Sequence, residues 1–362
     1  MTARLKFPTP DSRLATRDSP PLVRRTITTP NAHAPAHAHA TSTRPPLTST
    51  SIRIAVLALT LLAACKSEKQ SDAAESTLTT SFDGGRAMTY MQAQVDFGPR
   101  IPGSTGWKAA GDWIVAQMRA RADTVVVQEW THTTRDGKPL PMRNVFARFN
   151  PKATDRVLYV THWDTRPIAD SDPFPANRTK PVTGANDGAS GVGLFVALGD
   201  ALKKTPPSVG VDLLFVDGED YGSFDVGKDQ DVLIGSRYFA EHLPTPDYRP
   251  IFGVLWDMIG DRDLQIYQEG NSVAAAPEVV QRVWDTARRY GHQDVFIPEQ
   301  KWTVTDDHIP LIKAGLRVID VIDLDYKGPG GVDYHHTTQD TPDKVSARSL
   351  KAVGDVALAL VK

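Results

Sequence analysis

The fold class follows from the stretch V-L-Y-V-T-H-W-D at residues 157–164 and from V-D-L-L-F-V-D-G-E-D at residues 211–220. Each stretch begins with a nearly continuous apolar run of strand length and ends in acidic or imidazole side chains. Apolar runs that lack polar alternation are typical of strands buried on both faces of a sheet. The segment 189–203 between them has the apolar spacing of a helix. This alternation of strands and helices predicts an α/β protein.

The same pattern extends over most of the chain. Strand-like runs occur at 125–130, 144–149, 157–162, 211–216, 251–256 and 318–322. Helical spacing occurs at 87–95, 107–121, 189–203, 235–242, 277–290, 307–314 and 346–360. Because no linker-like segment interrupts these elements, we predict a single domain over residues 86–362. We expect a mixed, mostly parallel, twisted sheet with helices on both faces.

Composition and charge narrow the class of protein. The 362 residues are 40% hydrophobic and 23% charged, which is ordinary for a globular protein with a substantial core. The formal net charge is -2. A protein that binds nucleic acid needs a basic surplus or a basic stripe to contact phosphates, so the sequence excludes nucleic acid as a partner.

The N-terminal part of the chain has a different composition. Residues 1–50 are rich in Pro, Thr, Ser and Ala without apolar periodicity, which predicts a disordered extension. Residues 51–65 contain an apolar run that is too short to span a bilayer and end in L-A-A-C, which resembles the lipobox of a bacterial lipoprotein signal peptide. A polar segment at 66–85 predicts a flexible linker.

Cys65 is the only cysteine of the chain, so it cannot form an internal disulfide, and lipidation explains its position at the end of the apolar run. We therefore expect an exported, lipid-anchored protein of the cell envelope that faces the periplasm or the exterior. Membrane contact is expected through the lipid anchor alone.

Side chains that bind metals follow the apolar strands or begin helices. They form five clusters, which are H-W-D (162–164) with G-A-N-D-G (184–188), D-G-E-D (217–220), Asp257, T-D-D-H-I-P (305–310) and H-H-T-T-Q-D-T (335–341). The carboxyl ends of strands form the edge of an open α/β sheet where ligands bind. One such cluster is often only a helix cap, but five at successive strand ends indicate an enzyme site. Carboxylates and imidazoles without thiolates suit a catalytic zinc that keeps an open coordination position.

The order H-x-D, N-D-G, G-E-D, W-D-M and H-T-x-x-D-T resembles the zinc-dependent aminopeptidase family from about residue 88 to the end of the chain. Within that family, five segments resemble glutaminyl cyclases of the animal type and their bacterial relatives. These are F-G-P-R-I-P-G-S, H-W-D-T-R-P, G-A-N-D-G-A-S-G, G-E-D-Y-G and T-D-D-H-I-P. The resemblance implies a zinc exopeptidase-like fold and an enzyme that acts on peptide or protein N-termini.

The cyclase resemblance implies one zinc ion held by Asp187, Asp220 and His336, with Glu219 as the proton shuttle. The expected reaction converts N-terminal Gln to pyroglutamate: the zinc polarises the γ-amide carbonyl and the peptide's α-amine attacks it. Glu219 would take the amine proton and deliver it to the departing ammonia. Holding the amine beside the carbonyl supplies much of the acceleration.

The aminopeptidase alternative uses most of the same residues. In that branch, His162 and Asp257 would hold a second zinc ion, and the enzyme would hydrolyse the first peptide bond. In a cyclase, Asp257 and Asp306 would instead join a hydrogen-bond network beside the reacting amide. Asp306 separates the two branches best, because aminopeptidases usually place Ser or Thr before the Asp-His pair. A third reading, a binding module that has lost catalysis, conflicts with the complete set of acids and histidines.

Two positions depart from the animal cyclases. Asp220 stands where they carry a Glu ligand, and it still supplies an oxygen donor. His335 stands where they place a pocket-lining Trp, and the loop then also resembles an aminopeptidase. The choice of His336 over His335 as the metal ligand rests on the Thr that follows it and on the downstream Asp-Thr pair.

Overall fold

The computed structural model describes residues 78–224 and 230–362. The expected N-terminal extension, the signal peptide with Cys65, and the linker as far as residue 77 lie outside the described residues. None of the helices among the described residues is long and apolar enough to cross a membrane.

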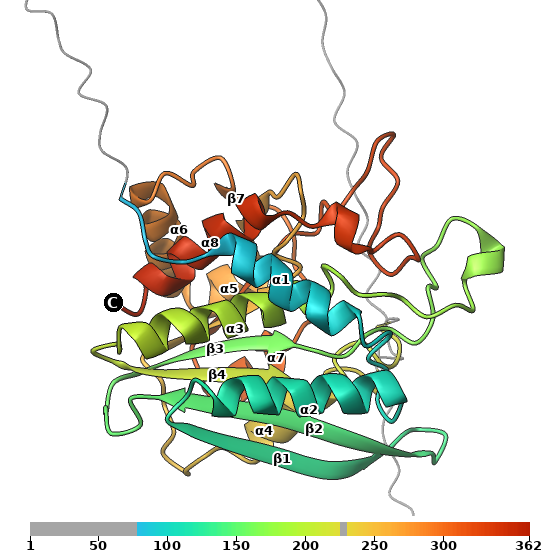
Figure 1. Cartoon of the computed structure of the whole chain (residues 1–362), viewed down its shortest axis with the longest axis horizontal. Helices are drawn as coiled ribbons and strands as arrows, with labels where there is room; N and C mark the ends of the chain where they lie inside the picture. The colour runs from blue at the N-terminus through green and yellow to red at the C-terminus, as the bar shows by residue number, and fades with distance from the viewer. Residues whose placement is uncertain (1–77, 225–229) are drawn as a thin grey trace, which may run out of the picture. The chain divides into compact units, whose positions relative to one another are not determined.

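A six-stranded sheet forms the centre of the domain, with the strand order β1-β2-β4-β3-β5-β8 (Figure 1). Its strands are β1 (Thr124–Thr133), β2 (Pro139–Phe149), β3 (Arg156–His162), β4 (Gly210–Val216), β5 (Phe252–Asp257) and β8 (Val318–Ile322). Strands β4, β3, β5 and β8 are parallel, whereas β2 pairs antiparallel with both β4 and β1. All six predicted strands are present, and the mixed, mostly parallel sheet is confirmed. The four parallel strands therefore end at one edge, where the site lies.

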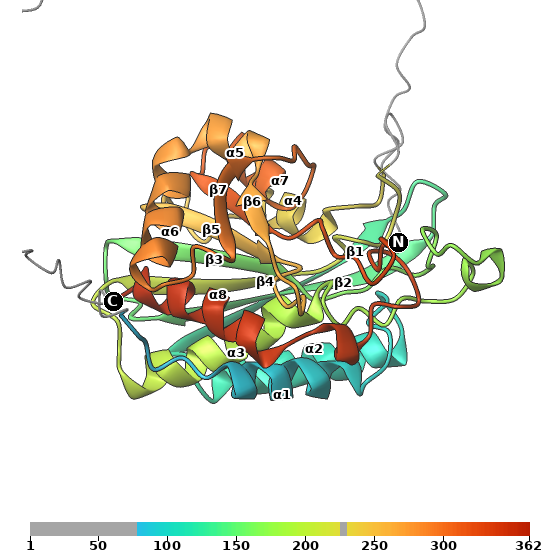
Figure 2. The same cartoon turned by 90° about the horizontal axis from the view of Figure 1, so that it is seen from above.

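Helices cover both faces of the sheet. On one face lie α1 (Gly84–Val95), α2 (Thr105–Arg119), α3 (Ala189–Lys204) and α8 (Ala347–Ala359), and on the other lie α4 (Ile234–Glu241) and α7 (His308–Lys313) (Figure 2). Along β3, Val157 and Tyr159 face the core of the first layer, while Leu158 and Val160 face the second. This alternation explains the continuous apolar run, because both sides of the strand are buried.

The structure adds short elements that the sequence patterns did not predict. They are the parallel pair β6 (Ile266–Gln268) and β7 (Phe296–Gln300), helix α5 (Gly270–Ala275), and the 3-10 turns η1 (Pro175–Asn177) and η2 (Pro342–Lys344). The remaining predicted helix is α6 (Pro277–Arg289), whose buried residues join the core of the first layer. Most of these short elements contain few apolar residues, so they carry neither an apolar run nor a helical apolar period.

Packing begins slightly before residue 86. Phe82 is buried and lies against Gly354 of α8, and the side chain of Asp83 accepts a hydrogen bond from the Arg86 N–H at the start of α1. Both residues lie in the segment that the sequence assigned to the linker. A buried aromatic ring and a helix cap tie this end of the chain to the domain.

Helix α3 approaches the sheet closely because glycine occupies position 191. A Cβ atom there would lie 2.7 Å from the carbonyl oxygen of Trp256 and would also meet the Thr161 side chain. The contact with Trp256 is to backbone, so it cannot be relieved by rotating a side chain. Gly191 thus lets the start of α3, and Asp187 just before it, sit against the carboxyl ends of β3 and β5.

We expect Gly191→Ala to lower the free energy of unfolding by about 1–3 kcal/mol, the usual cost of overpacking a core. Gly85→Ala in α1 is the matched control, because a Cβ there meets only a carboxylate oxygen of Asp83 at 3.3 Å. Alanine should stabilise that position by up to about 1 kcal/mol. Chemical denaturation of the two variants measures both changes. Equal effects of the two substitutions would contradict the close approach of α3.

Candidate active site

The carboxyl ends of the parallel strands surround a cavity of about 310 Å³. Its walls are formed by Asp187, Glu219, Phe224, Asp257, Met258, Val304, Thr305, Asp306, Ile322, Leu324, His335 and His336. Five of the residues expected in the site therefore line one cavity. The other two, His162 and Asp220, are fully buried and contact the lining residues from behind.

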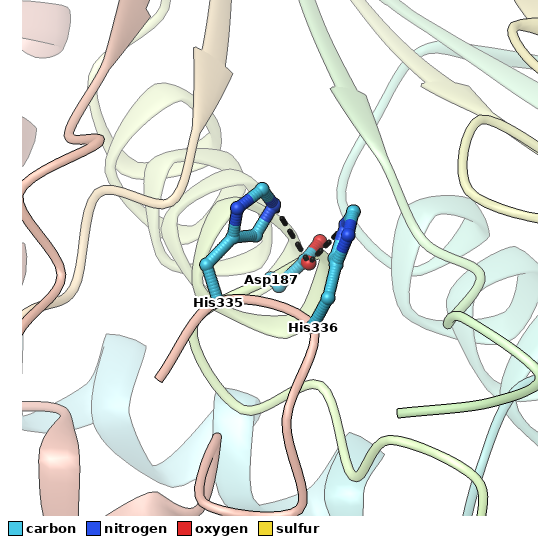
Figure 3. A group of neighbouring side chains, drawn as sticks. All are labelled: Asp187, His335 and His336. Carbon is cyan, nitrogen blue, oxygen red and sulfur yellow. Dashed lines mark ion pairs between the residues drawn. The ribbon is translucent and has the colours of Figure 1, made fainter. Parts of the chain in front are cut away.

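Asp187 lies at the centre of the polar groups. One carboxylate oxygen, Oδ1, is 3.0 Å from Nε2 of His162, and the other, Oδ2, is 3.6 Å from Nε2 of His336 and 3.9 Å from Nε2 of His335. Figure 3 shows the rings of His335 and His336 directed at Asp187 from one loop. Oδ2 is buried and has no hydrogen-bond partner. A buried carboxylate oxygen without a donor is costly, so a cation is its natural partner.

Asp220 offers a second oxygen of this kind. Its Oδ1 lies 3.1 Å from Nε2 of His336 and accepts a hydrogen bond of 2.8 Å from Nη1 of Arg166, whereas its Oδ2 is buried without a partner. Arg166 in turn pairs with Asp170. Asp187, Asp220 and His336 thus present two orphaned carboxylate oxygens and one imidazole nitrogen, a donor set that fits a catalytic zinc.

The two adjacent histidines differ in their contacts. The side chain of His336 is 13% exposed and reaches both Asp187 and Asp220, while that of His335 is 34% exposed and reaches Asp187 alone. The two rings lie with centroids 3.7 Å apart. Both histidines line the cavity, and ligand atoms of Asp187, His335 and His336 lie within 4.8 Å of one another, so either ring could reach an ion there. His336 has the additional contact with Asp220.

A second group of possible ligands shares Asp187. Nε2 of His162 lies between Oδ1 of Asp187 and Oδ1 of Asp257, which is 3.2 Å away, and its Nδ1 is 3.5 Å from Asp164. Burial alone lowers the pKa of His162, but the charge of Asp257 and hydrogen bonds to the neighbouring carboxylates raise that pKa well above its ordinary value. Without a metal ion, a protonated His162 therefore bridges these two acids.

Glu219, Asp257 and Asp306 form an acidic part of the cavity wall. Burial raises the pKa of Glu219 well above its ordinary value, and the charges of Asp220 and Asp306 raise it further. Burial likewise raises the pKa of Asp306, with added contributions from Asp257 and Asp307. Carboxyl groups this close share protons instead of ionising independently. The wall can therefore both accept and donate a proton at the cavity surface.

Several supporting residues had no role in the sequence analysis. The carboxylate of Asp164 accepts hydrogen bonds from the N–H groups of Glu219 and Asp220, at 3.1 and 3.2 Å, and thereby fixes the turn that carries both. The side chain of Asn186 accepts a hydrogen bond of 2.7 Å from the Gly260 N–H and so holds the loop that follows Asp257. Asp164 belongs to the H-x-D motif and Asn186 to the N-D-G motif, so the sequence motifs could have indicated both supporting residues.

The buried side chain of Glu269 holds the loop of Asp306. Oε1 of Glu269 accepts a hydrogen bond of 3.1 Å from the Val304 N–H, and Oε2 lies 3.3 Å from Nε2 of the fully buried His308. Glu269 also caps α5. No sequence motif marks Glu269, because its contacts join segments about forty residues apart.

Comparison with known proteins places the chain in a family. The model of peptidase family M28 matches residues 144–361, and the chain belongs to this family. The chain spans only 30–42% of the length of the first curated relatives that it matches. One of them is an aminopeptidase of Bacillus subtilis, which is 22% identical over 220 residues, or 59% of this chain.

Solved structures are similar over almost their whole length. Porphyromonas gingivalis glutaminyl cyclase is 38% identical, with a TM-score of 0.71, over 77% of this chain and 97% of the other. Bacteroides thetaiotaomicron glutaminyl cyclase bound to N-acetylhistamine is 34% identical, with a TM-score of 0.74, over 78% and 99%. A Zn-dependent exopeptidase from Parabacteroides distasonis is 33% identical, with a TM-score of 0.74, over 79% and 100%. The zinc exopeptidase-like fold is thereby confirmed.

The buried ionisable groups predict how the metal-free protein responds to pH. Burial raises the pKa of Asp307 and that of Asp323 to about 7, and the pKa of His162 is also raised. Between about pH 4 and pH 7 the folded chain therefore holds protons that the unfolded chain has lost, so its stability falls as pH rises.

We expect the unfolding temperature of the chelator-treated protein to drop by several degrees from about pH 5 to about pH 8. Added zinc should stabilise more strongly at the higher pH, because its ligands must be deprotonated. Calorimetry with and without zinc measures both trends. If the unfolding temperature of the metal-free protein stays level or rises over this range, the buried acids do not hold the expected protons.

Proposed function

We propose that this protein is a zinc-dependent glutaminyl-peptide cyclotransferase that converts the N-terminal Gln of peptides to pyroglutamate. The observation that carries the proposal is that Glu219, Asp257 and Asp306 line the same cavity as Asp187 and His336. The similarity to bacterial glutaminyl cyclases along nearly their full length supports it.

The donor set indicates how zinc would be held. Asp187, Asp220 and His336 form the expected ligand set, and the orphaned oxygens of the two acids fit a dication. A bound zinc ion supplies Lewis acidity that polarises the side-chain amide carbonyl of Gln. We propose one such ion for the cyclase.

The protein's own groups then manage the protons. The peptide's α-amine attacks the γ-carbonyl carbon, a C–N bond forms within the new ring, and the bond to the amide nitrogen breaks to release ammonia. Glu219 lines the cavity and takes the proton that the amine loses; it then delivers this proton to the departing nitrogen. Its raised pKa suits both steps. Asp257 and Asp306 beside it can accept hydrogen bonds from the amine and the leaving amide.

The alternative function is a two-zinc aminopeptidase, and one observation favours it. His162, Asp187 and Asp257 present ligand atoms within 4.8 Å of one another, which is a second place for a metal ion. An ion there would occupy the acidic side of the cavity and activate water for hydrolysis of the first peptide bond. Asp306 lines the same cavity, and burial together with the charges of Asp257 and Asp307 raises its pKa, so it can exchange protons with the acids beside it, which favours the cyclase.

The two functions differ in their products. We expect the zinc-loaded protein to convert a Gln-initiated peptide to its pyroglutamyl form with release of one ammonia, and to leave a Leu-initiated peptide of otherwise equal sequence intact. The zinc content should be about one ion per chain. Mass spectrometry of both peptides decides between the functions. Release of a free first amino acid, with no loss of ammonia from the Gln peptide, would establish the aminopeptidase instead.

The role of Glu219 is tested by Glu219→Gln, which keeps the shape of the side chain and removes its ability to move a proton. We expect turnover to fall roughly a hundredfold or more, while zinc content and fold stay as in the wild type. Glu299→Gln, at an exposed position of β7, is the matched control and should keep full turnover. Turnover of Glu219→Gln near that of the control would remove Glu219 from the mechanism.

A further inference from the structure

Asp340 joins the two loops that carry expected metal ligands. Its main-chain oxygen accepts a hydrogen bond from the Ala185 N–H at 3.4 Å, its Oδ1 accepts one from the Asn186 N–H at 2.8 Å, and its Oδ2 accepts one from the Asp187 N–H at 3.1 Å. Three consecutive amides thus bind a single residue. The hydroxyl of Tyr326 donates a further hydrogen bond of 2.8 Å to Oδ1.

The contact spans a long stretch of sequence. Asp187 stands directly before α3, and Asp340 follows His336 by four residues in the loop that leads to α8. Asp340 is fully buried and does not line the cavity. It therefore acts on the site through the backbone amides that it holds, which set the position of Asp187 relative to His336, and through its charge close to that of Asp187.

A carboxylate is the group that this position requires. The amides of residues 186 and 187 precede the first turn of α3 and have no carbonyl partner within the helix. Both oxygens of Asp340 must accept, since donors approach each of them. An asparagine could satisfy one side with its carbonyl oxygen, but it would direct its own N–H groups at the other amide donor.

We propose that Asp340 is a positioning residue that sets the zinc affinity of the site by holding the Asp187 loop against the His336 loop. This inference rests on the zinc site of the proposed function and is independent of the reaction that the site performs. Residues that orient metal ligands typically contribute 10–100-fold in affinity. The effect on zinc affinity can therefore be tested by substituting either Asp340 or Tyr326.

The test is zinc affinity at about pH 8, measured on the full chain by competition with a chromophoric chelator. We expect Asp340→Asn to raise the zinc dissociation constant roughly 10–100-fold, and Tyr326→Phe to raise it by a smaller factor, because only one of the hydrogen bonds is lost. Raising the zinc concentration should restore most of the turnover of Asp340→Asn, which damage to the fold would not allow.

The matched control is Asp355→Asn in α8. Asp355 is also a buried carboxylate that accepts from several donors, namely Thr80, His292 and Lys351, and none of these lines the cavity. This variant should lose stability while keeping its zinc affinity.

Three outcomes would overturn the inference. If Asp340→Asn unfolds at a lower temperature but binds zinc as tightly as the wild type, the residue is structural only. If Asp340→Asn does not fold, an unchanged affinity in Tyr326→Phe overturns the proposal, because that variant removes only a hydroxyl. A wild-type chain that binds no zinc would overturn both this inference and the proposed zinc enzyme. The first two outcomes, in contrast, would overturn this inference alone.

Discussion

The structure depends on bringing many carboxylates to one buried edge of a parallel sheet. Asp187, Asp220, Glu219, Asp257 and Asp306 all lie there with little or no exposure to solvent. Negative charges in such a place repel one another and lose their hydration, so the edge is stable only if protons, cationic side chains or metal ions compensate. The chain itself compensates through the raised pKa values of Glu219, Asp306 and His162 and through the pairing of Arg166 with Asp220.

A second set of acids organises the first by binding backbone amides. Asp164 holds the turn of Glu219 and Asp220, and Asp340 holds the loop of Asp187. Each uses both of its oxygens on neighbouring N–H groups, so a single side chain fixes two residues of the site. The acids therefore form two groups: those at the cavity, and those that bind backbone amides and so fix the positions of the cavity acids.

Asp187 links the two possible modes of metal binding. Its two oxygens point to different groups, one toward His162 and the other toward His336. The two groups of possible ligands therefore share Asp187, so the scaffold offers a place for one ion beside His336 and another beside His162. Asp306 adds a third acid beside Glu219 and Asp257, which suits proton transfer to an amine and a leaving amide better than it suits water activation.

The sequence by itself determined the secondary structure and the chemistry of the site. Nearly continuous apolar runs located the six strands of the central sheet, and apolar spacing of about 3.6 residues located seven of the helices, since burial leaves a local trace in the chain. Placing acids and histidines after apolar strands also indicated that Asp187, Glu219, Asp257, Asp306 and His336 meet, because parallel strands end at one edge.

Only the tertiary structure decided which atoms of these residues meet. The preference for His336 over His335 depends on ring positions around Asp187 and Asp220, and the pairing of Arg166 with Asp220 joins segments about fifty residues apart. The sequence placed Asp340 in the motif that follows His336, but only the structure shows that three amides before α3 donate hydrogen bonds to it. Such contacts leave no periodic trace in the sequence, because they arise between loops whose relative position is set by the packing of the whole domain.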